Sequence, residues 1–351
     1  MGRIVLHIGT HKTGTTSIQR FAARHRKALL EAGLYYPCYS EIGRPAHYAH
    51  LDVAKAIMGS PTRLGVDGLA EFATQVRAKS HNNAVTLISS EPFWRGLPAG
   101  SRPKSRDDYW EMRRAFIEAV ARVFPPDETE ILLVVRGQAD FAESLFKEDV
   151  KVNRWCHGLR KFVRQRWPYF CYAEQADLWA SVFPRVTALP FDDLSRDGNL
   201  VVAFLGHLGV DAPALPHAKR HNESIQPDFV TALRMMNRSD LPKRAIALTR
   251  EKLIDLQAVD EVRQWPKRSL WPNADARLEF DAAYQEENDR LIDRYGPPTA
   301  QKIRSRHLPD GTKFGERMTE DAITYLLKSL VLAAPEFAAS GPQNQPGSQP
   351  R

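Results

Sequence analysis

The 351-residue sequence has no apolar run of 18 residues or more, so it predicts no transmembrane helix. Its first seven residues are too few and too soon polar to form a signal peptide, and we therefore expect the protein in the cytoplasm. Cysteine is scarce: Cys38, Cys156 and Cys171 form no CxxC pair and have no metal-ligand spacing. We interpret them as reduced thiols, as is usual in a reducing compartment.

The sequence also lacks any nucleic-acid-binding motif. The net charge of +7 and a pI of about 9.3 favour an anionic ligand, but acidic residues are interspersed with the basic ones. We therefore expect no nucleic-acid partner. The apolar fraction of 43% is ordinary for a globular protein, and the length permits one large α/β domain.

Short apolar runs alternate with helical patterns in the first 200 residues. The runs that predict strands cover residues 4–8, 84–90, 130–135 and 186–191. The patterns that predict helices cover residues 14–32, 48–58, 67–78, 108–124 and 139–152. Strands that alternate with helices favour an α/β fold with a parallel β-sheet flanked by helices.

Beyond about residue 199 the sequence is almost wholly helical in pattern. The candidate helices there cover residues 200–208, 227–236, 244–259, 276–294 and 316–332. Residues 333–351 are poor in large apolar groups and predict a disordered tail. We therefore expect a single domain over residues 1–332.

A glycine-containing loop separates the first predicted strand from the first predicted helix. Gly9 and Gly14 have the spacing of a nucleotide-binding P-loop. A helix N-terminus exposes unpaired N–H groups and carries partial positive charge, so it binds phosphate readily. The alternative is a generic turn with chance hydroxyl groups. The candidate phosphate ligands are His11, Lys12, Thr13, Gly14, Thr15, Thr16 and Ser17.

The lysine of this loop is displaced from its place in kinases and NTPases. There the lysine directly follows the second glycine, whereas here Thr15 follows Gly14 and Lys12 precedes it by two positions. Such enzymes also need a magnesium site built with a distant acidic residue. A P-loop kinase or NTPase, which would bind ATP with magnesium, is therefore the weaker alternative.

Residues 11–16, His-Lys-Thr-Gly-Thr-Thr, resemble the 5′-phosphosulfate loop of sulfotransferases that use 3′-phosphoadenosine 5′-phosphosulfate (PAPS). The resemblance implies a P-loop-like three-layer α/β fold, PAPS as co-substrate and no metal. It implies transfer of a sulfuryl group to a hydroxyl or amine. The pattern is closer to the bacterial and carbohydrate or heparan-type enzymes than to the cytosolic phenol type.

A second signature of this family is a strand that ends in arginine, with a serine eight residues later. Here the predicted strand 130–135 is followed by Arg136, and Ser144 lies eight residues on. Arginine can bind a phosphate through two hydrogen bonds, and eight residues make just over two helical turns. The resemblance implies that both residues bind the 3′-phosphate. The alternative is an arginine at a strand end and a solvent-facing serine.

Two further site residues follow from the same resemblance. Residues 219–224 stand where many members place a basic loop over the nucleotide, which implies Arg220 as a ligand, although the longer Arg-Lys-Gly signature of the cytosolic enzymes is missing. Glu91 follows the predicted strand 84–90, at the edge where open α/β sheets bind ligands. A glutamate in the corresponding loop is the catalytic base of heparan-type enzymes. Glu91 and Lys12 are thus the candidate catalytic residues, although Glu91 can also be read as capping the next turn.

The acceptor is the least defined part of the hypothesis. A carbohydrate or glycolipid is expected from the resemblance. The basic and aromatic stretch 151–167 fits either an acceptor cleft for an anionic saccharide or lipid headgroup, or a solvated helix face. His47 and His50 are predicted to be ordinary surface residues. A non-catalytic protein that binds adenosine bisphosphate is the second alternative.

Overall fold

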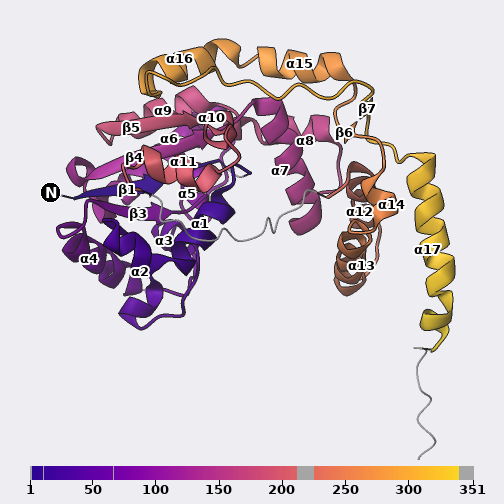
Figure 1. Ribbon diagram of the computed structural model, residues 1–351, viewed down its shortest axis with the longest axis horizontal. Coiled ribbons are helices and arrows are strands. Elements are labelled where there is room, and N and C mark those ends of the chain that lie inside the picture. Colours follow the sequence, from indigo (N-terminus) through magenta and orange to yellow (C-terminus); the bar gives the residue numbers. More distant parts are fainter. Residues whose placement is uncertain (1, 11, 66, 212–224, 340–351) are drawn as a thin grey trace, which may run out of the picture. The chain divides into compact units, whose positions relative to one another are not determined.

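The computed structural model describes all residues except 1, 11, 66, 212–224 and 340–351. The chain divides into two compact units, each assembled from three separate segments (Figure 1). Unit 1 comprises Met1–Leu145, Arg160–Glu223 and Asp275–Leu308. Unit 2 comprises Phe146–Leu159, Ser224–Ala274 and Pro309–Arg351.

Unit 1 is built on a five-stranded β-sheet with all strands parallel, in the order β2-β3-β1-β4-β5. The strands are β1 (Arg3–His7), β2 (Leu34–Tyr35), β3 (Val85–Ser89), β4 (Thr129–Val135) and β5 (Arg185–Pro190). The register places Leu6 between Ile88 and Ile131. The four predicted strands are confirmed, whereas β2 is too short to leave a pattern in the sequence.

Helices flank this sheet, which confirms the predicted α/β class. Those that lie wholly in unit 1 are α1 (Thr15–Arg24), α2 (Arg26–Glu31), α3 (Leu51–Ile57), α4 (Gly68–Ser80), α5 (Pro92–Arg95), α6 (Arg106–Val123), α9 (Tyr172–Ala180), α10 (Phe191–Ser195), α11 (Leu200–His207) and α16 (Gln285–Tyr295). Three more helices have residues in both units: α7 (Gln138–Val152), α8 (Leu159–Gln165) and α15 (Ala274–Ala282).

The sheet is covered by apolar helix faces. Val5, Leu132 and Val134 lie in one buried cluster with side chains of α1 and α11, such as Ile18 and Phe204. Every residue of β4 is buried, as expected for a central parallel strand covered on both faces. This packing fixes the strand ends, and with them the loops that carry the candidate site.

Two predicted helices are each divided in the structure. The pattern over residues 14–32 forms α1 and α2, which are separated at His25, where φ is −112°. The pattern over residues 276–294 forms α15 and α16, separated by a turn at Ala283 and Tyr284. In both cases the apolar spacing continues across the break, so the sequence pattern alone does not reveal it.

Unit 2 is mainly helical. It contains α12 (Pro227–Arg238), α13 (Lys243–Leu256), α14 (Asp260–Arg263), α17 (Glu320–Ala339) and a small parallel sheet of β6 (Arg268–Ser269) and β7 (Lys313–Phe314). Arg268 and Asp228 form a buried ion pair of 2.5 Å, and the Thr319 amide donates to the same carboxylate. This pair ties β6 to the starts of α12 and α17.

Helix α17 includes residues 333–339 of the segment expected to be a tail, and residues 340–351 lie outside the described part of the chain. Within the described residues, no helix is both long enough and apolar enough to span a membrane.

Candidate functional site

The residues singled out by the sequence meet at the carboxyl edge of the sheet in unit 1. Strands β3, β1 and β4 are neighbours and parallel, so their C-terminal ends lie side by side. Glu91 follows β3, the glycine-containing loop follows β1, and Arg136 follows β4. This edge is where open α/β sheets bind their ligands. The fold thus brings together three predicted groups that are far apart in the sequence.

The loop after β1 is anchored to β4. The Ile8 amide donates to the Leu132 carbonyl (3.0 Å), and the Thr10 amide donates to the Val134 carbonyl (3.1 Å). The buried Thr10 hydroxyl donates to the same Val134 carbonyl, and the Thr13 hydroxyl donates to the Thr10 carbonyl (2.7 Å). The loop is therefore preformed by hydrogen bonds that do not depend on a ligand.

Two residues of the loop adopt the left-handed backbone conformation, Lys12 with φ 70° and Gly14 with φ 73°. Glycine adopts it at little cost, whereas lysine pays roughly 1–2 kcal/mol. Among the described residues, the amides of Gly14, Thr15 and Thr16 have no hydrogen-bond acceptor. Three orphan donors at a helix N-terminus form a site for an anion.

The hydroxyl groups of the loop differ in exposure. Thr13 and Thr15 are buried with their Oγ1 atoms 3.4 Å apart, whereas Thr16 is half-buried and Ser17 is exposed. Because the Thr13 proton goes to the Thr10 carbonyl, this hydroxyl shapes the loop itself. The Ser17 amide donates to the Gly14 carbonyl (2.9 Å) and closes the first turn of α1. His11 lies outside the described residues.

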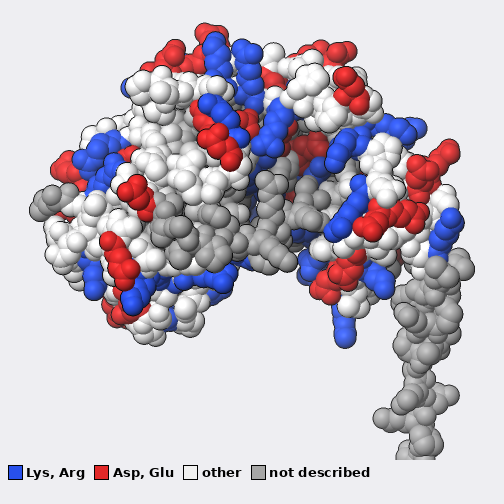
Figure 2. Space-filling model, viewed as in Figure 1, with Lys and Arg blue, Asp and Glu red and all other residues white. Residues whose placement is uncertain are grey.

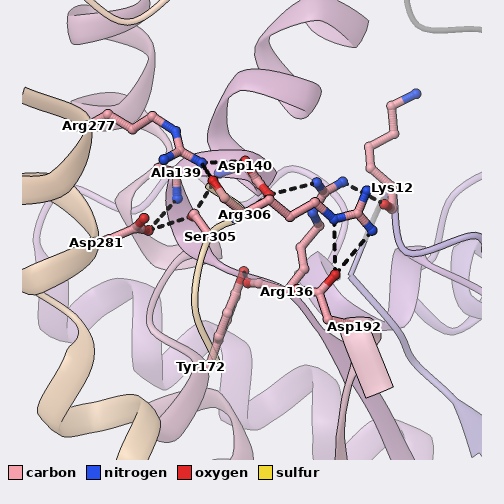
Figure 3. A network of polar contacts seen from close by, with 10 residues as sticks. All are labelled: Lys12, Arg136, Ala139, Asp140, Tyr172, Asp192, Arg277, Asp281, Ser305 and Arg306. Carbon is pink, nitrogen blue, oxygen red and sulfur yellow. Dashed lines mark hydrogen bonds and ion pairs between the residues drawn. The ribbon is translucent and has the colours of Figure 1, made fainter. Parts of the chain in front are cut away.

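Arg136 joins the end of β4 to the loop. Its Nη1 donates to the Lys12 carbonyl (3.1 Å), and its Nη2 forms an ion pair with Asp140 (3.2 Å) (Figure 3). The Tyr172 hydroxyl donates to the Arg136 carbonyl (2.9 Å). Figure 3 shows the Lys12 side chain pointing away from this guanidinium group. The Nε of Arg136 is buried with no partner among the described residues.

Asp140 is the centre of the network around Arg136. Its carboxylate also accepts from Arg277 (2.8 Å) and from the Arg306 amide (3.1 Å), while the Arg306 side chain pairs with Asp192 (3.1 Å). Burial acts to raise the pKa of Asp140, but Arg136, the Arg306 amide and Arg277 together hold it below its ordinary value. Asp140 is therefore ionised and fixes the guanidinium of Arg136.

The turn between β4 and α7 is held by a segment far along the chain. A Cβ on Gly137 would lie 2.1 Å from the Ser305 backbone nitrogen, so only glycine fits there. The Ser305 hydroxyl accepts from the Asp140 amide (3.2 Å) and donates to Asp281 (2.8 Å). The Ala139 amide donates to Asp281 as well (2.8 Å). Sequence reasoning missed Arg277, Asp281, Ser305 and Arg306, because no local motif marks them.

Ser144 is half-buried on α7, one turn beyond Asp140. Residues four apart share a helix face, so it lies on the side that carries the Arg136–Asp140 pair. Its hydroxyl has no partner within the described part of the chain. Arg220, the other predicted nucleotide ligand, lies outside the described residues.

Glu91 is partly buried at the end of β3, and the short helix α5 follows it. Gln19 on α1 donates to its Oε2 (3.2 Å). Burial raises the pKa of Glu91 above its ordinary value. Hydrogen bonds from its own amide and from Gln19, and electrostatic interactions with Arg95 and His47, act in the opposite direction and offset part of this rise. A carboxylate with a raised pKa is a better proton acceptor near neutral pH.

His50 is not on the surface, so the prediction was wrong for this residue. It is 2% exposed; its Nδ1 accepts from the Ser89 amide (3.1 Å), and its Nε2 lies 3.0 Å from the Pro37 carbonyl. Burial lowers the pKa of His50 to about 4, so the ring is neutral. His50 thereby fixes the backbone two residues before Glu91. The neighbouring His47 is half-buried and stacks on Tyr48.

A buried arginine fixes the chain on the other side of Glu91. Arg113 on α6 is fully buried and donates to the carbonyls of Phe93 (2.5 Å) and Gly96 (2.8 Å) and to Gln175 (2.9 Å). All three acceptors are uncharged, and burial lowers the pKa of Arg113 to about 10. The arginine therefore clamps the turn of α5. Its role was not predicted, since an arginine within a helix is usually exposed.

The basic and aromatic stretch contributes the fully buried Phe162 and the Trp167 ring to packing within unit 1. The Trp167 ring lies against Tyr109 (5.6 Å between centroids), and the Arg106 guanidinium stacks on it at 4.6 Å. Arg160 and Arg164 on α8 are exposed. An acceptor-binding role of this stretch stays a prediction.

The described residues contain no group of three or more His, Cys, Asp or Glu side chains that could hold a metal ion. Cys38, Cys156 and Cys171 are free thiols.

Comparison with known proteins gives matches in structure only. No protein-family model matches the sequence, and no curated protein is significantly similar to it. A sulfotransferase from Alicyclobacillus acidocaldarius is similar in structure with a TM-score of 0.38 and 17% identity, over 75% of this chain and 99% of that chain. A sulfotransferase domain from the curacin biosynthetic pathway has a TM-score of 0.31 and 12% identity, over 72% and 97% of the two chains.

Proposed function

We propose that this protein is a sulfotransferase that moves a sulfuryl group from PAPS to a hydroxyl or amine of an acceptor. The hydrogen bond from Arg136 to the Lys12 carbonyl (3.1 Å) is the observation that carries the proposal. PAPS bears phosphate at both its 3′ and 5′ positions, so it needs two cationic sites close together. The loop with its orphan amides and the guanidinium of Arg136 supply two such sites in direct contact.

Each residue of the site then has a defined task. The amides of Gly14, Thr15 and Thr16 bind the 5′ end of the nucleotide, and Arg136 with Ser144 binds the 3′-phosphate. PAPS supplies the sulfuryl group. As the acceptor oxygen or nitrogen forms its bond to sulfur, the bond from sulfur to the 5′-phosphate oxygen breaks. Lys12 and the loop amides stabilise the negative charge that builds on that phosphate.

Glu91 is the base in this scheme. It accepts the proton that the acceptor hydroxyl or amine loses, and its partly buried position raises its pKa toward the range where such transfer is efficient. The backbone on both sides of Glu91 is fixed by His50 and by Arg113. Precise placement of a base matters because misplacement of about 1 Å can cost roughly a hundredfold in rate.

Arginines near Glu91 or on the segments around it favour an acceptor that is itself anionic, a saccharide or a lipid headgroup: Arg95 acts on Glu91 directly, and Arg20 follows Gln19 on α1. Arg26 donates only to backbone carbonyls, and Arg20 stacks on Tyr48 at 5.2 Å. Among the described residues, neither these arginines nor Arg95 forms an ion pair with a carboxylate. Figure 2 shows Lys and Arg side chains along the lower edge of unit 1, with Asp and Glu side chains among them. An acidic group on the acceptor would neutralise this excess of positive charge.

Matched acceptors test this charge preference. With labelled PAPS, we expect 4-nitrophenyl glucuronide to be sulfated more efficiently than 4-nitrophenyl glucoside, from which it differs by one carboxylate. The Arg20→Ala variant should lose most of that preference, whereas Arg122→Ala, an exposed arginine on α6, should keep it. Equal rates with both acceptors in the wild type would rule out an anionic acceptor.

Nucleotide binding and transfer test the function itself. We expect calorimetry to show binding of 3′,5′-adenosine bisphosphate without magnesium, and labelled PAPS to donate to members of a panel of saccharides, lipids and phenols. Binding of magnesium ATP in preference to the bisphosphate would indicate a P-loop kinase instead. Binding of the bisphosphate with no transfer to any acceptor would indicate a non-catalytic protein.

A further inference from the structure

A chain of hydrogen bonds runs through unit 1 from the underside of the loop to Glu91. Gln19 is 1% exposed, and its Nε2 lies 3.2 Å from Glu91 Oε2 and 3.1 Å from Ser89 Oγ. Ser89 Oγ in turn lies 2.9 Å from His7 Nδ1. Both Ser89 and His7 are fully buried. His7 on β1, Ser89 on β3 and Gln19 on α1 are thus linked to Glu91, at the start of α5, without contact with solvent apart from the partly exposed Glu91.

The chemistry of the groups gives this chain a direction. An amide nitrogen only donates, so Gln19 donates to both Glu91 and Ser89. The Ser89 hydroxyl then has its own proton to donate, and His7 Nδ1 is the acceptor within reach. Burial lowers the pKa of His7 to about 3, so the ring is neutral. With Ser89 donating to Nδ1, the single proton of this ring is assigned to Nε2.

The far end of the chain lies beneath the loop. His7 Nε2 has no partner among the described residues, and a Cβ on Gly9 would lie only 2.6 Å from it. A glycine at position 9 is therefore required for the loop to pass over the imidazole ring. The relay consequently spans from the floor of the loop to the carboxylate at the end of β3.

We propose that Gln19 is the positioning residue that holds the Glu91 carboxylate in its ionised form and orients it toward the acceptor, through the buried relay His7–Ser89–Gln19–Glu91. This inference rests on the proposed role of Glu91 as base. Gln19 lies five residues after Gly14 on α1. The base is therefore attached to the same helix whose N-terminus binds the nucleotide, so donor and base keep a fixed separation.

The other charged or titratable groups near Glu91 do not replace this contact. Arg95 on α5 and His47 in the segment after β2 act on Glu91 electrostatically, without a hydrogen bond, and the buried phenol of Tyr36 near it is neutral because burial raises its pKa well above the ordinary value. Within the described part of the chain, the side chain of Gln19 donates a hydrogen bond to the Glu91 carboxylate, and no other side chain does. A buried hydrogen bond to a charged group is worth about ten- to a hundredfold in an equilibrium.

The test is the titration of Glu91 in the full-length protein, followed by NMR of ¹³C-labelled glutamate carboxyl groups. The Glu91→Gln variant assigns the resonance. Gln19→Met keeps the approximate shape but removes the donor, so we expect the titration midpoint of Glu91 to move to higher pH. The matched control is Thr86→Val, which removes a fully buried hydroxyl without a partner from the same strand β3. It should leave the midpoint unchanged.

Activity supplies the second readout. In Gln19→Met we expect kcat to fall about ten- to a hundredfold, the acidic limb of its pH profile to move to higher pH, and the KM for PAPS to stay within about twofold. If the methionine variant does not fold, Gln19→Asn is used instead. Its side chain is one methylene shorter, so its amide no longer reaches Glu91, and the Glu91 midpoint is again expected to move to higher pH. An unchanged Glu91 midpoint, or an equal shift in Thr86→Val, would overturn the inference.

The two proposals fail in different ways. If the wild type transfers no sulfuryl group from PAPS to any acceptor, the proposed function is wrong. The NMR titration needs neither PAPS nor acceptor, so it decides independently whether Gln19 controls the ionisation of Glu91.

Discussion

The Nη1 of Arg136 donates a hydrogen bond of 3.1 Å to the backbone carbonyl of Lys12, which has the left-handed conformation with φ 70°. This contact connects residues 124 positions apart in the sequence. It offsets part of the conformational cost at Lys12, since the carbonyl is turned toward a cation. The loop and the end of β4 therefore behave as one structural element.

Replacing Lys12 by alanine should abolish transfer and leave the fold intact. Alanine meets the same left-handed constraint as lysine, so the loop conformation costs no more than before. Loss of a well-placed electrostatic group typically lowers the rate by about 10²–10³. Single-turnover assays with labelled PAPS check the rate and thermal unfolding checks the fold. Lys27→Ala, on the exposed side of α2, is the matched control and should keep wild-type activity.

A glycine at position 12 should separate stability from activity. Because glycine adopts the left-handed conformation freely, we expect Lys12→Gly to raise the free energy of unfolding by about 1 kcal/mol over Lys12→Ala, with no recovery of activity. Urea titration measures the difference. Equal stability of the two variants would show that φ at position 12 is not strained in solution.

Arg136→Ala should weaken nucleotide binding more than it weakens the fold. Asp140 keeps Arg277 and the Arg306 amide as partners, so no buried carboxylate is left unpaired. Loss of hydrogen bonds to a charged phosphate should reduce the affinity for 3′,5′-adenosine bisphosphate by about ten- to a hundredfold. Calorimetry measures this loss, and Arg136→Lys should recover only part of it because lysine lacks the planar fork. Wild-type affinity in the alanine variant would contradict the assignment of Arg136.

Glu91→Gln should remove activity and increase stability at neutral pH. The pKa of Glu91 is raised in the folded protein, so the folded state binds its proton more tightly than the unfolded state does. Stability from this group therefore falls as pH rises from the unfolded value through the folded value. We expect Tm of Glu91→Gln to exceed that of the wild type at pH 8 and to equal it at pH 4. A variant less stable than the wild type at pH 8 would show that the carboxylate is not desolvated.

Arg113→Met should destabilise the protein by about 3 kcal/mol or more. The substitution leaves the buried carbonyls of Phe93 and Gly96 and the amide oxygen of Gln175 without a donor, at about 1–3 kcal/mol each. Urea unfolding measures the loss. Arg114→Met is the matched control, because that arginine is exposed on the same helix and should cost less than about 0.5 kcal/mol. Similar losses in both variants would argue against a clamp at Arg113.

The fold was largely accessible from the sequence where patterns are long. The runs at β1, β3, β4 and β5 were identified because both faces of a central parallel strand are apolar. The two-residue strand β2 was missed because it is defined by its pairing with β3, not by its own side chains. The breaks at His25 and Ala283 were missed because apolar spacing continues across them.

The candidate site could be predicted from the sequence only where its residues form a contiguous motif. The loop and the Arg136–Ser144 spacing are contiguous motifs, so the sequence reveals them. Asp140 is four residues from Arg136, a spacing that suits an ion pair, so the sequence also carries this signal. Arg277 and Arg306 could not be found this way, because their partners are set by the tertiary fold. His50 was misjudged because burial of a polar ring depends on acceptors contributed by other segments.

The contacts of Asp140 with Arg277 and Arg306 determine when the site can form. These partners lie 137 and 166 residues further along the chain. During synthesis, the loop and β4 leave the ribosome long before the segment that packs on Gly137. Contacts of such long sequence separation form late in folding. A nascent or truncated chain that ends before residue 304 therefore contains the loop and Arg136 but lacks Ser305 and Arg306, two of the partners that hold the turn after β4 and the carboxylate of Asp140 in place.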